Sequence, residues 1–221
     1  MLYFTHKLLH EKNAKDLSRL LMMSPDWVDG KAASAPGSLI KKNLQLNFGK
    51  EDYSKFSTEI INIIENDSSI QNYSFPAKIF NILFTRTGAG MFYGPHTDLP
   101  YLATGRRDLS FTIFLNDPKD YKGGELILYI SPEKKQIKLN PGEMIIYPTK
   151  YLHEVKEVTE GERMVCVGWI ESQIPRDDDR ESLFLMKIGM SGIAKQLGSN
   201  PNPAIQNLKV SFNRIYKRFL N

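Results

Sequence analysis

The stretch that decides the fold covers residues 124–172, "GELILYISPEKKQIKLNPGEMIIYPTKYLHEVKEVTEGERMVCVGWIES". Short runs rich in β-branched and aromatic residues recur in it, separated by the turn signals "SPEKK", "NPGE" and "EGE". Two earlier runs, at 78–87 and 108–117, have the same character. Many short strands at close spacing predict an antiparallel sandwich or barrel.

Helical patterns flank this β-rich region on both sides. Residues 11–23 and 54–67 carry apolar residues at helical spacing, and so do 176–198 and 202–220. A loop at 29–42 is rich in Gly, Ala, Ser and Pro, and it is either a substrate lid or a simple connector.

We therefore expect a mainly β fold with flanking helices, divided into three regions. Residues 1–74 hold the N-terminal helices and the lid loop, packed on the core. Residues 75–174 form the β core, and 175–221 form a C-terminal helical extension.

Composition excludes several classes of protein. The chain has 221 residues, 41% of them hydrophobic, which is enough for one sizeable core. A net charge of +4 without a broad basic cluster disfavours nucleic-acid binding. Cys166 is the one cysteine, so no internal disulfide forms. Without a signal peptide or a membrane-length apolar run, we expect a cytoplasmic protein that does not bind membranes. The oligomeric state is not indicated.

Two of the four histidines suggest a metal site. His96 and Asp98 lie in "YGPHTDLPYL", residues 93–102, and side chains at i and i+2 of an extended segment point the same way. His153, at the junction of two predicted strands, is the other histidine of the β region. Two histidines and one carboxylate form a facial triad suited to non-haem Fe(II). The alternative is a surface His-X-Asp pair and a strand-end histidine bonded to a backbone carbonyl.

Arg163 opens an apolar strand ten positions after His153. An arginine pointing into a barrel is costly unless an anion pairs with it, and a dicarboxylate provides one. The alternative is a surface pair with Glu160 or Glu162. Arg106 and Arg107 either contact a substrate backbone or lie in solvent.

In this order and spacing, these residues resemble the Fe(II)/2-oxoglutarate-dependent dioxygenases, and more closely the PKHD-type hydroxylases, the prolyl/lysyl hydroxylase domain proteins of bacteria. The resemblance covers most of the chain. It includes "HTD", "RRDLSFTIFLND", "YKGGELIL", "IKLNPGEMIIYPTKYLHEVKEVTEGER" and "GWIES".

The resemblance implies a double-stranded β-helix core, a jelly roll of cupin-like type. It implies that His96, Asp98 and His153 bind Fe(II) and that Arg163 binds 2-oxoglutarate. Trp169 lines the pocket or belongs to the core. Many relatives hold 2-oxoglutarate with a second group, a tyrosine, where this chain has Thr87; that anchor is then Thr87, Tyr93 or Thr112.

The implied reaction uses O2 and 2-oxoglutarate to hydroxylate a prolyl, or another, residue of a protein or peptide, releasing succinate and CO2. Ascorbate (vitamin C) keeps the iron reduced. Two other functions stay open: a cupin-like barrel that binds a metal or ligand without catalysis, and a nucleic-acid-modifying oxygenase. Because Asp98 is present, hydroxylation is favoured over halogenation.

Overall fold

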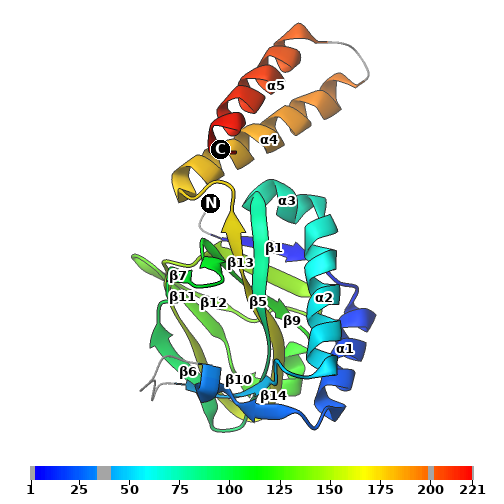
Figure 1. Ribbon diagram of the computed structural model, residues 1–221, viewed down its shortest axis with the longest axis vertical. Coiled ribbons are helices and arrows are strands. Elements are labelled where there is room, and N and C mark those ends of the chain that lie inside the picture. The colour runs from blue at the N-terminus through cyan, green and yellow to red at the C-terminus, as the bar shows by residue number, and fades with distance from the viewer. Residues whose placement is uncertain (1–2, 34–40, 199–201, 221) are drawn as a thin grey trace.

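One long strand, β14 (Leu152–Ser172), organises the fold of this computed structural model, which describes residues 3–33, 41–198 and 202–220 (Figure 1). Its first half belongs to one sheet and its second half to another. The first sheet runs in the order β3 (Lys41–Lys42), β6 (Met91–His96), β14, β11 (Leu126–Ile130) and β12 (Glu133–Ile137). The short β10 (Tyr121–Gly123) also pairs with this half of β14.

The second sheet is larger and carries the second half of β14 between two long neighbours. Its order is β1 (Phe4–Lys7), β13 (Glu143–Pro148), β9 (Leu109–Phe114), β14, β5 (Pro76–Gly88), β4 (Leu44–Leu46) and β2 (Trp27–Asp29). These ladders are antiparallel, as the sequence predicts. A small hairpin, β7 (Tyr101–Leu102) with β8 (Gly105–Arg106), stands apart from both sheets.

Helices cover the outer face of the larger sheet. Figure 1 shows α1 (Glu11–Met23), α2 (Glu51–Asn66) and α3 (Ser68–Ser74) along one side of it. The Asp67 carboxylate begins α3 by accepting hydrogen bonds from the amides of Ser69 and Ile70, at 2.9 Å each. Among the described helices, none is long and apolar enough to cross a bilayer.

The C-terminal helices form a hairpin, α4 (Asp177–Leu197) and α5 (Pro203–Tyr216), that projects beyond the sheets in Figure 1. Asn202 caps α5 and a proline follows it at the first helical position. The described part of the chain also contains three short 3-10 turns: Gly30–Ala33, Pro118–Asp120 and Lys217–Phe219.

Two apolar clusters hold the layers together. One lies between the helices and the larger sheet and includes Leu21, Ile64 and Phe84, all with no exposed surface. The other lies between the two sheets and includes Phe114 and Val165. Leu126, Tyr147 and Val165 of the second cluster also line a cavity.

Two features differ from the sequence prediction. The segment "EGE" at 160–162 is not a turn between strands, because β14 continues through it. Gly161 takes a φ of +74° there, and a side chain would lie 2.0 Å from the Asp120 carbonyl oxygen, so glycine is required. In addition, the N-terminal region contributes β1 to β4 as well as its helices.

Candidate active site

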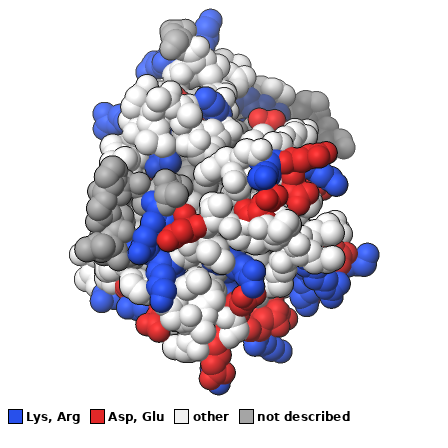
Figure 2. All heavy atoms as spheres, turned by 60° about the horizontal axis from the view of Figure 1, so that its bottom comes forward, with Lys and Arg blue, Asp and Glu red and all other residues white. Residues whose placement is uncertain are grey.

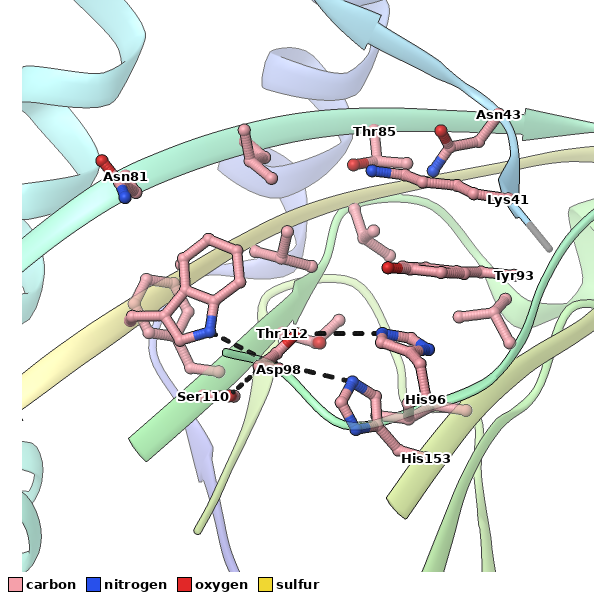
Figure 3. Close-up of a pocket in the computed structure, with 18 of the residues that line it drawn as sticks. Lys41, Asn43, Asn81, Thr85, Tyr93, His96, Asp98, Ser110, Thr112 and His153 are labelled. Carbon is pink, nitrogen blue, oxygen red and sulfur yellow. Dashed lines mark hydrogen bonds and ion pairs between the residues drawn. The ribbon is translucent and has the colours of Figure 1, made fainter. Parts of the chain in front are cut away.

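The pairing of β6 with β14 brings the two histidines together. His96 and His153 are cross-strand partners, and their ring centroids lie 4.2 Å apart. Asp98 follows two residues after His96, beyond the end of β6. His96 Nε2 lies 3.8 Å from Asp98 Oδ1, and His153 Nε2 lies 3.9 Å from Asp98 Oδ2 (Figure 3). One ligand atom from each residue lies within 4.8 Å of the others, so the three can hold one metal ion.

Backbone carbonyls orient both imidazoles. His96 Nδ1 donates to the Gly94 oxygen over 2.8 Å, and His153 Nδ1 donates to the Tyr151 oxygen over 2.9 Å. Because a carbonyl only accepts, each Nδ1 carries the hydrogen and each Nε2 keeps its lone pair toward Asp98. Burial and the neighbouring His153 lower the pKa of His96 to about 4, so its ring is neutral at pH 7. Neutral imidazole is the form that binds metal.

Two donors fix the Asp98 carboxylate. Ser110 Oγ donates to Asp98 Oδ2 over 2.8 Å, and Trp169 Nε1 donates to the same oxygen over 2.9 Å. Ser110 and Thr149 hydroxyls lie 3.0 Å apart and extend this network. Such hydrogen bonds around a ligand set its orientation and basicity. Trp169 therefore lines the cavity, one of the two alternatives that the sequence left open, and it also positions the carboxylate.

A cavity of about 690 Å³ extends from these three residues between the sheets. Alternate residues of β14 line it: Arg163, Val165, Val167 and Trp169. This is the alternation expected of a strand with one face toward a barrel interior. Leu83, Phe111 and Leu126 add further apolar surface.

Arg163 lies within this cavity with 2% of its surface exposed. Its Nε has no hydrogen-bond partner among the residues that the structure describes. The predicted alternative, a surface pair with Glu160 or Glu162, is wrong, because Glu160 pairs with Lys122 and Glu162 pairs with Arg86. Burial lowers the pKa of Arg163, although the nearby Tyr121 and Tyr147 hydroxyls offset part of the effect. A buried guanidinium without an anion fits an acidic ligand.

The three candidates for a second cosubstrate anchor all line the cavity. Thr87 and Thr112 are buried, Thr87 as the direct cross-strand partner of Arg163, and Tyr93 stacks on His96 at 3.6 Å between centroids. Tyr147 contributes a further hydroxyl to the cavity, and it was not identified from the sequence. Burial, followed by the Asp98 charge, raises its pKa well above the ordinary range. Its place as a tyrosine within the apolar run "EMIIYP" is the signal that could have identified it.

Other cavity residues come from the end of the 29–42 loop, predicted as a lid or a connector, and from the segment that follows it. Lys41, Asn43 and Gln45 line the cavity and are buried. Half of the predicted loop at 29–42, namely residues 34–40, lies outside the described residues. Arg107 also lines the cavity, whereas Arg106 is paired with Asp108 and Glu171.

Comparison with known proteins identifies the class. The model of the 2OG-Fe(II) oxygenase superfamily matches residues 82–171. Two solved structures share the fold. A Pseudomonas putida prolyl-4-hydroxylase aligns with a TM-score of 0.54 and 17% sequence identity, covering 77% of this chain and 92% of that one. A Trichoplax adhaerens prolyl hydroxylase, in complex with a hypoxia inducible factor peptide fragment, aligns with a TM-score of 0.57 and 18% identity, covering 82% of this chain and 86% of that one. The double-stranded β-helix prediction is confirmed, and the chain is a 2OG-Fe(II) oxygenase.

Sequence relatives give the family within that class. A PKHD-type hydroxylase of Prochlorococcus marinus (strain MIT 9301) is 42% identical over 201 residues, 90% of each chain. Another, from strain MIT 9515 of the same species, is 39% identical over 219 residues, 98% of each chain. The chain belongs to the PKHD-type hydroxylase family.

Proposed function

We propose that this hydroxylase acts on a prolyl residue of a protein or peptide. One oxygen atom of O2 enters a C–H bond of the substrate, and the other enters 2-oxoglutarate, which leaves as succinate and CO2. The observation that carries this proposal is the buried Arg163, which forms no ion pair with any described residue, in the same cavity as the two histidines and the aspartate. A metal site alone does not need a buried cation beside it.

The residues of the cluster fit Fe(II). Two neutral imidazole nitrogens and one carboxylate are the donor set of non-haem Fe(II) oxygenases, and they leave coordination positions open. His96, Asp98 and His153 would hold the metal, which when bound supplies the activation of O2 for hydroxylation. The presence of the Asp98 carboxylate favours hydroxylation over halogenation.

Arg163 would hold the far carboxylate of 2-oxoglutarate through a bidentate contact. Thr87 lies directly across the β5–β14 ladder from it, and Thr112 and Tyr147 offer hydroxyls in the same cavity. The apolar β14 side chains between Arg163 and Trp169 exclude water from the space that the cosubstrate occupies. Ascorbate enters this proposal as the external reductant that the family implies.

Two alternatives are less well supported. A non-catalytic cupin-like barrel does not account for the buried Arg163, because metal binding alone does not need a buried cation. A nucleic-acid-modifying oxygenase would need a broad basic surface. On the face shown in Figure 2, Lys and Arg side chains are interspersed with Asp and Glu instead.

The test measures products in two assays. Purified protein with Fe(II), ascorbate and 2-oxoglutarate should form succinate under O2, and it should form none when Fe(II) is left out. Host proteins incubated with the enzyme should gain one oxygen at prolyl residues by mass spectrometry, and Asp98→Gly protein is the matched control. Succinate formation without a hydroxylated prolyl residue would refute the assignment of a prolyl substrate. If no succinate forms, the proposed oxygenase reaction itself is refuted.

A further inference from the structure

The segment "KKNLQL", residues 41–46, buries three of its four polar side chains. Lys41, Asn43 and Gln45 alternate along it and line the cavity, with 5%, 8% and 2% of their surfaces exposed. Lys42, between the first two, is exposed. A strand with one buried face normally buries its apolar residues and exposes its polar ones. Here the cavity-facing positions are polar, which is the pattern of a binding surface.

Two of these side chains end in unpaired acceptors. Asn43 Oδ1 and Gln45 Oε1 are buried and have no hydrogen-bond partner within 3–33, 41–198 and 202–220. Leaving a buried polar atom unpaired costs free energy, so proteins rarely do so without a ligand or water. Figure 3 shows Asn43 and Lys41 above Tyr93 at the edge of the cavity, and the Lys41 ammonium lies 5.1 Å from the centre of the Tyr93 ring.

A second cation lines the same cavity. Arg107 stacks on the Trp169 indole, with its Cζ 3.7 Å from the ring centroid. Its Nε is buried and has no partner in the described part of the chain. Its neighbour Arg106 is engaged by Asp108 and Glu171. Arg107 is therefore the arginine of this pair that is available to a ligand.

The charges of the loaded site do not balance. Among the described residues, the charged side chains that line the cavity are Lys41, Asp98, Arg107 and Arg163. Asp98 and one carboxylate of 2-oxoglutarate would offset the two charges of Fe(II), and Arg163 would offset the other carboxylate. Lys41 and Arg107 then remain as two positive charges without a counter-charge. In a cavity of low dielectric, such charges favour an anion strongly.

We propose that Lys41 and Arg107 bind a carboxylate of the substrate, so the enzyme selects acidic substrates. Gln45 Oε1 accepts a hydrogen bond from an amide that flanks this carboxylate. The inference rests on the proposed function and narrows it: the hydroxylated residue lies beside an acidic group. That group is either an acidic side chain of a peptide or a terminal carboxylate.

Binding of matched probes tests this on protein loaded with Mn(II) and 2-oxoglutarate. The first probes are short peptides with one central proline and a glutamate placed in turn at each flanking position, each compared with its glutamine counterpart. The second pair is N-acetylproline and its amide. We expect the acid of at least one pair to bind about tenfold more tightly than its neutral counterpart, and added salt to reduce the difference.

Variants assign the preference to particular residues. Lys41→Met and Arg107→Gln should each remove most of the preference for the acid, about tenfold in affinity. Lys42→Met changes the net charge equally on the exposed side of the same strand, and it should retain the preference. If acid and amide do not differ in any pair, or if Lys42→Met removes the preference as Lys41→Met does, the inference is wrong.

One alternative occupant is 2-oxoglutarate itself. If Lys41→Met weakens 2-oxoglutarate binding to the Mn(II) protein as strongly as Arg163→Met does, Lys41 is a cosubstrate anchor and the inference is overturned. Failure of the proposed function can be told apart from failure of this inference. If the acid preference depends on Lys41 but the Fe(II) enzyme hydroxylates none of the peptides, the prolyl peptide assignment fails and the acidic subsite stands.

Discussion

The Trp169 indole donates its Nε1 hydrogen to Asp98 Oδ2 over 2.9 Å, joining residues 71 positions apart in the chain. Ser110 donates to the same oxygen. Both donors lie on one side of the carboxylate, so Oδ1 receives neither of these two bonds and points toward His96 Nε2. Trp169 is thus a positioning residue for the proposed metal ligand as well as part of the cavity wall.

Replacing Trp169 by Phe should weaken metal binding, because it keeps an aromatic ring but removes the hydrogen bond. We expect Mn(II) affinity to fall about tenfold to hundredfold, measured by electron paramagnetic resonance titration. Trp27→Phe is the matched control, since the Trp27 indole donates to the Leu21 carbonyl instead. Equal Mn(II) affinity in the two variants would contradict the positioning role.

Asp98→Gly should abolish hydroxylation, because it removes the carboxylate from the metal site. The variant should also bind Mn(II) at least about a hundredfold more weakly, since a ligand is lost outright. Succinate release and Mn(II) titration measure the two effects. Full turnover in this variant would refute the ligand assignment.

Arg163→Met should weaken 2-oxoglutarate binding without lowering the stability of the ligand-free protein. Removing one partner of a buried charge pair costs about 2–5 kcal/mol, so 2-oxoglutarate affinity should fall at least about thirtyfold. The ligand-free variant should unfold in urea at the same or a higher concentration, because an unpaired buried cation has been removed. Arg86→Met, which breaks the partly exposed pair with Glu162, should leave 2-oxoglutarate affinity unchanged. Loss of affinity in both variants would count against a specific role for Arg163.

Lys41→Met should change how stability depends on pH. Burial lowers the pKa of Lys41 from 10.5 to about 8, so between these values the unfolded chain binds a proton that the folded protein does not. Stability from this group therefore rises with pH across that window, and at pH 7 the buried charge costs about 3 kcal/mol.

The metal-free Lys41→Met protein should accordingly be the more stable one at pH 7, and its advantage should shrink between pH 8 and 10.5. Urea denaturation at several pH values measures this difference, with Lys42→Met as the control for net charge. A difference that stays constant with pH would show that Lys41 is not desolvated.

Much of the site could be predicted because its residues follow short-range rules. His96 and Asp98 share one segment, and Arg163 falls on the inward positions of an apolar strand. The strand alternation of residues 163–169 needs no tertiary information. The resemblance supplied the step that spacing alone does not give, namely that His153 meets the other two.

The remaining features depend on contacts between distant parts of the chain. The run "EGE" has turn composition, yet pairing with β10 extends β14 through it. The short β1 to β4 strands are fixed by partners far along the sequence. The sequence places Lys41 in a predicted loop and does not single out Asn43 and Gln45, because a sequence shows polarity but not which face a cavity occupies.

His153 and Arg163 lie on a single uninterrupted strand, β14, although they belong to different sheets. Inserting or deleting one residue between them would turn one of the two side chains to the opposite face. The number of residues along β14 between the proposed iron ligand His153 and the proposed 2-oxoglutarate anchor Arg163 therefore has to stay fixed if both side chains are to reach the cavity.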